Sequence, residues 1–358
     1  MKILHICQFL GIGGLEKVLL TLCQEQIEHG NEVSLFVYDK DQRWVEKYMN
    51  AGVNVINNYQ KCEGYDFRLL NKIKEVSLNY DIIHTHDLNP ALYLAPLSFI
   101  PGAKLSFIHT THGMEHLKTR PKTRLYEAVV GMCASKIVSV STDFGNYYLK
   151  QPLTKNRKVR LINNGVEQTL LPERSPKKLY CEEFNLNPKL PLAAYVARVG
   201  PMKDQKRLID IYNNSEHQLL IIGPSSDLSY YAACKRSSKK NIVLTGARND
   251  IRNILGGLDY YISSSKHEGL PISVLEAGAS NTPCLLSQIP GHEIFNIEKE
   301  CVMLFKEDEN PLDRYSDLLK KKNVLVKNFK DEITEKYSSK TMFKRYHSVY
   351  KELLAEKC

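Results

Sequence analysis

The stretch KILHICQFLGIGGLEKVLLTLCQEQIEHG, residues 2–30, decides the fold class. Its opening residues are mostly apolar and predict a buried strand over 2–9. The glycines at 11, 13 and 14 predict a tight turn, and the apolar residues at 15, 18, 19 and 22 then repeat with helical spacing, with Gly30 suited to end the helix. A buried strand followed directly by an amphipathic helix is typical of a parallel α/β sheet that is covered on both faces.

The same alternation continues along the first half of the chain and restarts after residue 165. In the first half, strands are predicted over 32–38, 81–86, 104–111, 136–141 and 158–163. In the second half, they are predicted over 192–197, 217–223, 241–246, 259–265, 283–287 and 301–305. The stretch 167–191 is polar and proline-bearing and predicts a connector plus a short helix, whereas 339–357 predicts a final amphipathic helix. A chain of 358 residues is too long for one ordinary core, so we expect two doubly wound α/β domains.

Composition excludes several classes of protein. The chain is 43% apolar and 25% charged, which is typical of a globular protein. The apolar stretch 91–100 is too short to span a bilayer, and the N-terminus lacks the features of a signal peptide. Nine cysteines with no C-x-x-C pair favour a reduced cytoplasmic chain without a metal knuckle or a disulfide framework.

The net charge of +9 is unevenly distributed. Residues 1–100 carry 9 Lys/Arg against 12 Asp/Glu, whereas residues 101–166 carry 11 against 3. This excess, with Phe144, Tyr147 and Tyr148 nearby, suggests peripheral docking on an anionic membrane surface. The ordinary alternative is a solvated surface. No nucleic-acid partner is expected, because the basic region lacks a recognition module.

The glycine turn GIGGLEK, 11–17, is suited to bring backbone close to a phosphate. Glu16 takes the third glycine position of the dinucleotide fingerprint, so the turn fails the nicotinamide pattern. A tight structural turn explains it equally well. Two histidines, His86 and His112, follow predicted strands and could reach a ligand, although a structural role is the commoner one for such residues.

In the second half, ARVGPMKDQKRLI (197–209) places Arg198 at a strand end and Lys203 at a helix start. A cation at a helix N-terminus opposes the helix dipole, a cost that makes sense if an anion binds there. Two fixed cations suit a nucleoside diphosphate leaving group, on which charge grows as its bond to the sugar breaks. The alternative is two ordinary surface cations.

The stretch HEGLPISVLEAG, 267–278, holds two glutamates eight positions apart. Glu268 lies in the loop after a predicted strand, and Pro271 suits the first turn of the next helix. Glu276 falls in the second turn of that helix. Both carboxylates can therefore flank one helix end, where backbone N–H groups bind phosphate or sugar oxygens and carboxylates accept bonds from hydroxyls.

These motifs occur in one order along nearly the whole chain. They are the glycine loop with Glu16, DIIHTHD (81–87), TTHG (110–113), INNGV (162–166), Arg198 with Lys203, LTGARND (244–250) and EGLPISVLEAG (268–278). Together they resemble the family 4 retaining glycosyltransferases of GT-B fold, of the bacterial surface-polysaccharide type. The resemblance implies two Rossmann-like domains facing a central cleft, an acceptor-side domain over 1–166 and a donor-binding domain over 167–340. It also implies that a C-terminal helix, about 341–358, packs back on the first domain.

The resemblance implies a hexosyltransferase-type enzyme that moves a sugar from a nucleotide-sugar donor to a glycan or lipid-linked acceptor. The residues it implies for catalysis are Arg198 and Lys203 on the diphosphate, Glu268 near the transferred sugar, and His112 on the sugar. The donor-binding residues are Gly13, Gly14, Ala247, Arg248, Gly269, Leu270, Pro271 and Glu276, the last on the ribose. Glu16 and His86 fall on the acceptor side.

The resemblance also bears on mechanism and on cofactors. Retention often uses a carboxylate nucleophile, but this family is thought to let the acceptor attack on the leaving-group face. Glu268 is therefore not expected to be a nucleophile. No cofactor and no metal are expected, because no D-x-D motif was identified and two cations can replace a metal ion.

Departures from the family pattern leave the donor open. The usual Lys-Gly is Lys203-Asp204 here, Glu167 follows INNGV where Asp is common, and the loop 221–227 keeps one glycine. A UDP-sugar is favoured, with a GDP-sugar as the alternative. Two other functions remain open, a nucleotide-sugar 2-epimerase of the same fold and a non-catalytic sugar-nucleotide-binding relative. A nicotinamide-dependent dehydrogenase is disfavoured by the glycine loop.

Overall fold

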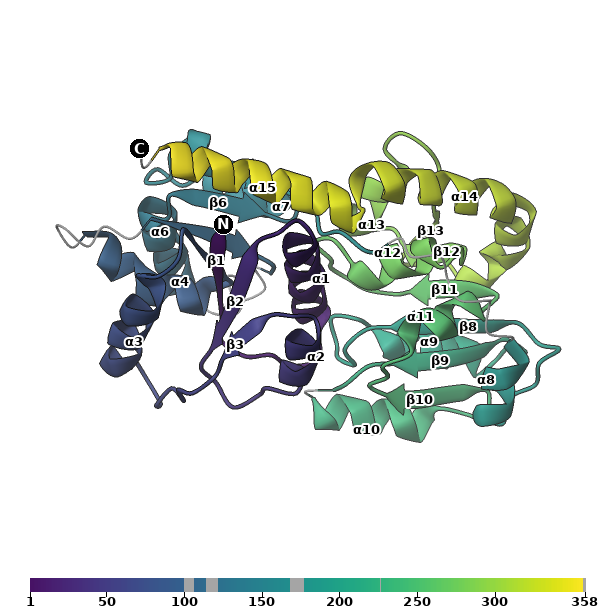
Figure 1. The fold of residues 1–358 in the computed structure, drawn as a ribbon. Coiled ribbons are helices and arrows are strands. Elements are labelled where there is room, and N and C mark those ends of the chain that lie inside the picture. Colours follow the sequence, from purple (N-terminus) through teal and green to yellow (C-terminus); the bar gives the residue numbers. More distant parts are fainter. Residues whose placement is uncertain (100–105, 114–121, 168–176, 226, 357–358) are drawn as a thin grey trace. The chain divides into compact units, whose positions relative to one another are not determined.

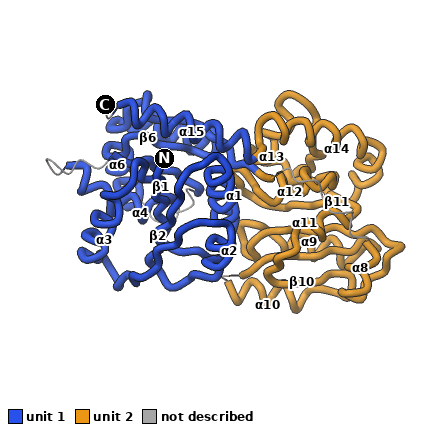
Figure 2. Tube along the Cα trace, viewed as in Figure 1, with its two compact units in different colours: residues 1–165, 339–358 blue, residues 166–338 orange. Residues whose placement is uncertain are grey.

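A computed structural model describes the chain apart from residues 100–105, 114–121, 168–176, 226 and 357–358 (Figure 1). The chain divides into two compact units, which Figure 2 colours separately. Unit 1 comprises Met1–Gly165 and Ser339–Cys358, and unit 2 comprises Val166–Ser338. Each unit contains one parallel sheet with its own apolar core, so the predicted α/β class is confirmed.

The sheet of unit 1 has seven strands in the order β3-β2-β1-β4-β5-β6-β7. All neighbouring strands are parallel. The strands are β1 Lys2–Cys7, β2 Glu32–Val37, β3 Asn54–Ile56, β4 Ile82–His86, β5 Phe107–Thr111, β6 Lys136–Ser139 and β7 Val159–Leu161. The sequence predicted all of them except β3, which is only three residues long and has no fully buried residue to mark it.

Helices cover both faces of this sheet. The core on one face includes residues of α1 and α2, and α15 packs against α1 on the same side. The core on the other face includes residues of α3, α4, α6 and α7. The helices are α1 Gly14–Glu28, α2 Val45–Asn50, α3 Phe67–Ser77, α4 Leu88–Leu94, α6 Thr123–Cys133, α7 Thr142–Leu149 and α15 Ser339–Ala355, with the 3-10 turns η1 Ala95–Phe99 and η2 Asn156–Lys158. Gly30 follows the C-cap of α1 with φ +76°, as predicted for a helix stop.

Unit 2 has a six-stranded parallel sheet in the order β10-β9-β8-β11-β12-β13. Its strands are β8 Leu192–Val196, β9 Gln218–Ile222, β10 Ile242–Gly246, β11 Tyr260–Ser263, β12 Cys284–Ser287 and β13 Met303–Phe305. Its helices are α8 Lys177–Glu183, α9 Gln205–Tyr212, α10 Leu228–Ser237, α11 Ile251–Gly256, α12 Ile272–Ala279, α13 Pro290–Glu293 and α14 Tyr315–Lys336, with 3-10 turns η3 Ile294–Asn296 and η4 Pro311–Arg314.

Each sheet reverses its winding direction once. In unit 1 the chain winds outward from β1 to β3 and then returns to the other side of β1 with β4. In unit 2 it winds from β8 to β10 and returns beside β8 with β11. Ligands of open α/β sheets bind at such switch points, outside the carboxyl ends of the strands. The loops after β1 and β4, and those after β8 and β11, are therefore the places to look for a site.

Candidate active site

Two cationic residues lie in the loop that follows β8. Arg198 is exposed and makes no ion pair with any residue in the described part of the chain. Lys203 lies just before Asp204, the N-cap of α9. The main-chain carbonyl of Lys203 accepts hydrogen bonds from Tyr195 Oη at 2.9 Å and Ser264 Oγ at 3.1 Å, so β8 and the segment after β11 both hold it.

Asp204 occupies the position that is usually glycine after this lysine. Its backbone is left-handed, with φ +52°. Glycine adopts this conformation without cost, and aspartate is one of the few other residues that tolerates it. Its carboxylate lies 3.1 Å from Lys266 Nζ, and its carbonyl accepts a bond from Ser264 Oγ at 2.9 Å. The departure from the family motif thus preserves the backbone shape that glycine would give.

The structure brings Lys203 and Glu268 together. Lys203 Nζ lies 2.6 Å from Glu268 Oε1, and the two side chains are only 21% and 15% exposed. Glu268 comes from the loop after β11, and β11 pairs directly with β8. The two charges therefore follow adjacent strands, and their loops meet at the switch point of the sheet.

Close packing fixes the backbone at Glu268. A Cβ atom added to Gly291, in α13, would lie 2.4 Å from the Glu268 carbonyl oxygen and 2.8 Å from its carbonyl carbon. Only a residue without a side chain lets α13 approach the loop this closely. Gly291 was not among the residues predicted for the site.

Helix α12 begins one residue later than predicted. Pro271 is its N-cap, and Ile272 is its first helical residue. No side chain in the described chain caps this helix, so its first N–H groups point out of the helix end as anion-binding donors. The buried Leu270 and the half-buried Gly269 link this end to Glu268. Glu276 lies in the second turn of α12 and is 5% exposed.

Ala247 and Arg248 follow β10, whose last residue, Gly246, has φ +74°. The Arg248 guanidinium is already engaged, with Asp250 Oδ2 at 2.7 Å and Glu183 Oε1 at 2.5 Å. These hydrogen bonds raise its pKa above the ordinary arginine value. Arg248 therefore holds the loop in place through these ion pairs. The neighbouring Ala247 is exposed and is the residue of this pair that is open to a ligand.

His292 is a further residue that sequence reasoning missed. It is fully buried in α13, and its Nδ1–H donates to the Ser287 carbonyl at 2.8 Å. Its Nε2 is bare, buried and without a hydrogen-bond partner among the described residues. Burial lowers the pKa of this histidine, while the charge of Glu268 opposes that shift.

In unit 1, the glycine loop after β1 is organised by Glu16. Its Oε1 accepts the Gly11 N–H at 3.1 Å, and a Cβ atom on Gly13 would lie 2.6 Å from its Oε2. Gly13 is the N-cap of α1, and the exposed Gly14 is its first residue. Glu16, which was predicted for the acceptor side, is 5% exposed, and its carboxylate binds the backbone of its own loop.

The two predicted histidines are in direct contact. His86 Nδ1 lies 3.0 Å from His112 Nε2. The other ring nitrogen of His86 bonds His5 Nδ1 at 2.9 Å, and His86 is 2% exposed. Both ring nitrogens of His86 are therefore engaged within the protein, and its place on the acceptor side stays a prediction. The Nδ1 atom of His112 bonds no residue of the described chain, and the main-chain N–H of His112 is held by Asp87 Oδ1 at 3.0 Å.

The statement that the chain lacks a D-x-D motif is wrong, because Asp39-Lys40-Asp41 is one. Paired carboxylates of this kind can hold a divalent cation. Here Asp39 Oδ2 accepts from Gln8 Nε2 at 2.8 Å, and Asp41 Oδ2 pairs with Arg43 at 2.7 Å. The hydrogen bond from Arg43 lowers the pKa of Asp41. Both carboxylates therefore have protein partners.

The aromatic residues that we associated with membrane docking belong to the core instead. Phe144 and Tyr148 are 6% and 0% exposed and pack in the core beneath α7, with Tyr147 half-buried beside them. Residues 118–121 of the basic stretch lie outside the described residues. Within the described chain, no helix has both the length and the apolar character that crossing a bilayer requires.

Two sequence families match this chain, one on each half. The family described as Glycosyltransferase Family 4 matches residues 12–170, and the one described as Glycosyl transferases group 1 matches residues 177–336. The UDP-Gal:alpha-D-GlcNAc-diphosphoundecaprenol alpha-1,3-galactosyltransferase of Escherichia coli is 25% identical over 316 residues, 81% of this chain and 79% of the relative. The O-antigen biosynthesis glycosyltransferase WclY of Escherichia coli is 22% identical over 371 residues, 99% of each chain.

Solved structures share the fold. Anabaena Alr3699/HepE in complex with UDP-glucose superimposes with a TM-score of 0.85 at 15% identity, covering 98% of this chain and 100% of that one. This likeness and the two parallel sheets show the GT-B fold, as predicted. The chain belongs to glycosyltransferase family 4, with the group 1 family on its second half.

Proposed function

We propose that this glycosyltransferase uses a nucleoside diphosphate sugar and retains the configuration of the transferred sugar. One observation carries the proposal. Lys203 and Glu268 form a largely buried ion pair beside the uncapped end of α12. A diphosphate fits this arrangement, because Lys203, Arg198 and the helix N–H groups together supply fixed positive charge. The charge that develops on the leaving group is then stabilised where it forms.

The carboxylates take different roles in this proposal. The buried Glu276 accepts hydrogen bonds from the ribose hydroxyls. Glu268 lies near the transferred sugar with the backbone of Gly269, Leu270 and Pro271, and Ala247 lies beside the base. In this proposal Glu268 does not act as a nucleophile, and its Oε1 accepts a hydrogen bond from Lys203 Nζ at 2.6 Å. The acceptor attacks on the leaving-group face, and a phosphate oxygen takes its proton.

The residues of unit 1 complete the proposal. His112 bonds a hydroxyl of the transferred sugar, and Gly13 and Gly14 lie beside the diphosphate, while Glu16 keeps their loop in shape. No metal ion is required, because the two cations of unit 2 provide the charge. The carboxylates of Asp39 and Asp41 already have Gln8 and Arg43 as partners, which is consistent with metal-free transfer.

We propose a UDP-sugar donor and a lipid-linked or growing surface glycan as acceptor. The support is that a relative at 25% identity is named for UDP-Gal and a diphosphoundecaprenol acceptor, and that a structural neighbour binds UDP-glucose. A GDP-sugar is the alternative donor. In the same proposal, the enzyme works in the cytoplasm.

Thermal shift measurements test the donor. The protein is heated with UDP, GDP or NAD⁺, each with and without EDTA. A ligand at 100 times its Kd stabilises the folded protein by about 2.7 kcal/mol. We expect a shift with UDP that survives EDTA. A shift only with NAD⁺ contradicts the proposal, and a shift that EDTA abolishes contradicts metal independence.

Acceptor dependence separates the alternatives. A glycosyltransferase consumes its donor only slowly without an acceptor, whereas a nucleotide-sugar 2-epimerase converts it without one. A non-catalytic relative binds the nucleotide and does neither. Donor consumption is therefore measured by release of nucleotide, with and without a lipid-linked glycan, and the anomeric configuration of the product is read by NMR to test retention.

Peripheral membrane docking belongs to the same proposal, with a revised set of residues. Leu125 and Tyr126 on α6 are 67% and 44% exposed, and the neighbouring Arg124 is also exposed. Apolar side chains beside a cation suit an anionic lipid surface. Sedimentation with anionic vesicles at low salt tests this, and equal binding by a Leu125→Ser, Tyr126→Ser variant contradicts it.

A further inference from the structure

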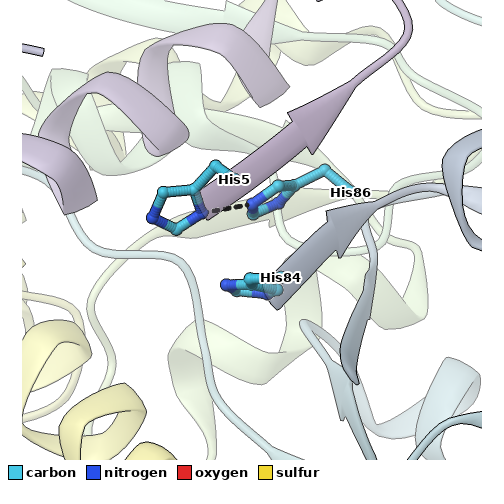
Figure 3. A group of neighbouring side chains, drawn as sticks. All are labelled: His5, His84 and His86. Carbon is cyan, nitrogen blue, oxygen red and sulfur yellow. Dashed lines mark hydrogen bonds between the residues drawn. The ribbon is translucent and has the colours of Figure 1, made fainter. Parts of the chain in front are cut away.

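A row of hydrogen bonds runs along the face of the unit 1 sheet that α1 and α15 cover. Gln26 Oε1, on α1, lies 2.9 Å from His5 Nε2. His5 Nδ1 lies 2.9 Å from His86 Nε2, and His86 Nδ1 lies 3.0 Å from His112 Nε2. Figure 3 shows His5 and His86 joined between β1 and β4, with His84 beside them. The first two histidines are buried, and the row ends at the proposed sugar contact.

The row continues in the other direction from Gln26 into α15. Gln26 Nε2 donates to Tyr350 Oη at 3.1 Å, and Tyr350 Oη lies 2.9 Å from His84 Nδ1. His84 Nε2 lies 2.7 Å from Thr110 Oγ1, which lies 3.2 Å from Tyr346 Oη. The result is one continuous chain of eight side chains, which we call the histidine relay. From one end to the other it consists of Tyr346, Thr110, His84, Tyr350, Gln26, His5, His86 and His112.

Burial keeps the imidazoles of the relay neutral. Desolvation lowers the pKa of His5 to about 4 and that of His112 to about 3. It also lowers the pKa of His84 and His86 well below the ordinary value. A neutral imidazole has one N–H donor and one bare nitrogen acceptor. When two such rings bond in series, the proton position on the first therefore fixes the proton position on the next.

Gln26 selects the direction of the relay. Its Oε1 only accepts hydrogen bonds, so His5 carries its proton on Nε2, and its bare Nδ1 accepts from His86 Nε2–H. His86 Nδ1 is then bare and accepts from His112 Nε2–H. The last ring nitrogen, His112 Nδ1, is left bare. It is buried and has no hydrogen-bond partner in the described part of the chain.

We propose that Gln26 is a positioning residue: acting through the two intervening histidines, it keeps His112 in the tautomer whose Nδ1 is unprotonated and accepts a hydrogen bond from a substrate hydroxyl. Tyr350 supports it by accepting from the amide Nε2, which keeps Oε1 toward His5. The second ring nitrogen of a ligand-contacting histidine is commonly set by the bond that the first nitrogen makes. Here the bond at His112 Nε2 is determined by Gln26 on α1, through His5 and His86.

A metal ion is the competing use of this cluster, because His5, His84 and His86 present nitrogens within 4.8 Å of one another. The geometry favours hydrogen bonding. The 2.9 Å between His5 Nδ1 and His86 Nε2 is shorter than the roughly 3.3 Å that separates two nitrogen ligands of a tetrahedral zinc ion. Both nitrogens of each of the three rings also already have a protein partner.

The relay has a consequence for substrate choice, which rests on the proposed function. A bare, neutral nitrogen accepts from a hydroxyl but offers nothing to a carboxylate, which is itself only an acceptor. His112 therefore favours a neutral hexose over a hexuronate. A sugar that lacks the contacted hydroxyl leaves this buried nitrogen unsatisfied, which costs affinity.

Nitrogen NMR of the full chain labelled with ¹⁵N-histidine tests the relay directly, because long-range ¹H–¹⁵N spectra separate protonated from bare ring nitrogens. The His112 signals are assigned by their loss in His112→Asn. At pH 7.5 we expect His112 with a proton on Nε2 and none on Nδ1. A proton on Nδ1 would overturn the proposal, as would stoichiometric zinc whose removal by EDTA shifts the His5 and His86 signals.

Variants then test which residue sets the tautomer. Gln26→Leu and the milder Tyr350→Phe should give His112 a second tautomer and lower kcat/KM by roughly two- to tenfold, the value of one neutral hydrogen bond. Thr110→Val, on the far side of Gln26, should leave the His112 signals unchanged. UDP binding should be unchanged throughout, because none of the groups proposed to contact UDP belongs to the relay.

The outcomes separate this inference from the proposed function. An unchanged His112 tautomer in both Gln26→Leu and Tyr350→Phe, with folded protein by circular dichroism, refutes the relay even if transfer is observed. Absence of any nucleotide binding refutes the proposed function, while the tautomer measurement still stands on its own.

Discussion

Lys203 Nζ lies 2.6 Å from Glu268 Oε1, across two loops that adjacent strands β8 and β11 bring together. In the ligand-free structure the Glu268 carboxylate thus pairs with the ammonium group that, in the proposed function, stabilises the leaving group. In that proposal a bound diphosphate competes with Glu268 for Lys203. The pair therefore holds Lys203 in place before the donor arrives, without leaving its charge uncompensated.

Replacing Lys203 with alanine should reduce transfer by about 10²–10³-fold, the range seen when one preorganised group that stabilises developing charge is lost. The effect should fall mainly on kcat, because charge grows on the leaving group in the transition state. Steady-state kinetics with the nucleotide-sugar measure it. The matched control is Lys206→Ala, which removes an exposed ion pair with Asp210 and should leave kcat unchanged. Unchanged kinetics in Lys203→Ala would show that the diphosphate binds elsewhere.

Removing the Glu276 carboxylate should raise the KM for the donor by roughly ten- to a hundredfold, the value of hydrogen bonds to a charged group. If ribose binds equally in the ground and transition states, kcat should change little. Donor titration of Glu276→Ala measures both constants. Glu300→Ala, which removes a surface pair with Lys321, is the control. A fall in kcat at constant KM would mean that Glu276 acts on the reacting sugar instead.

Gly291→Ala should lower both stability and activity, because the added methyl group would lie 2.4 Å from the Glu268 carbonyl oxygen. Overpacking of this kind costs about 1–3 kcal/mol, and relief requires Glu268 to move. Urea unfolding and transfer rates measure the two effects. The control is Gly145→Ala in α7, where the new methyl would meet Ser139 at 3.7 Å, an ordinary contact. Equal behaviour of the two variants would contradict the close contact.

Asp204→Gly should be as stable as the parent to within about 0.5 kcal/mol, because glycine needs no support at φ +52°. Asp204→Ala should be less stable than Asp204→Gly by about 1 kcal/mol, because both variants lose the contact with Lys266 but only alanine is strained in the left-handed conformation. Urea unfolding followed by circular dichroism compares them. An alanine variant as stable as the glycine variant would argue against backbone strain as the reason for this residue.

Unit 1 should lose stability between pH 7 and pH 5. The pKa of His5 is lowered to about 4, so at pH 5 the unfolded chain binds a proton that the folded chain does not. Each such histidine costs about 2 kcal/mol over this interval. Urea unfolding monitored by Trp44, the chain's only tryptophan and a residue of unit 1, reports the change.

Replacing one relay histidine provides the check on that pH dependence. His5→Gln should show a smaller loss of stability between the two pH values than the parent, by about 2 kcal/mol. His267→Gln, in unit 2, should leave the dependence of the Trp44 signal unchanged. A parent protein equally stable at both pH values would mean that the histidines are already charged when folded.

The strands of both sheets were predictable because parallel strands are buried on both faces and appear as apolar runs. β3 escaped because it is short and half-exposed. Lys203 and Glu268 could be predicted for one site from their separate motifs, but the ion pair between them was found only in the structure. Gly291 and His292 could not be predicted, because their importance depends on how closely α13 approaches the Glu268 loop, which spacing along the chain does not reveal.

The histidine relay was only partly visible in the sequence. The alternation of β4 puts His84 and His86 on one face, but the decisive partners, Gln26 and Tyr350, come from helices whose packing the sequence does not specify. The same limit misled us on Phe144 and Tyr148. Their aromatic character suggested a membrane surface, whereas α7 turns both rings into the core.

Tyr346 and Tyr350 lie on α15, which follows the whole of Val166–Ser338 in the chain yet belongs to unit 1. During synthesis, unit 2 has all of its residues once Ser338 has left the ribosome, whereas the sheet of unit 1 still lacks part of its cover. Nascent chains usually fold from the N-terminal domain onward. In this protein the first domain to be translated is therefore the last that can be completed. Premature termination before Tyr350 would leave all residues of unit 2 present but would expose the imidazoles of β1 and β4 to water.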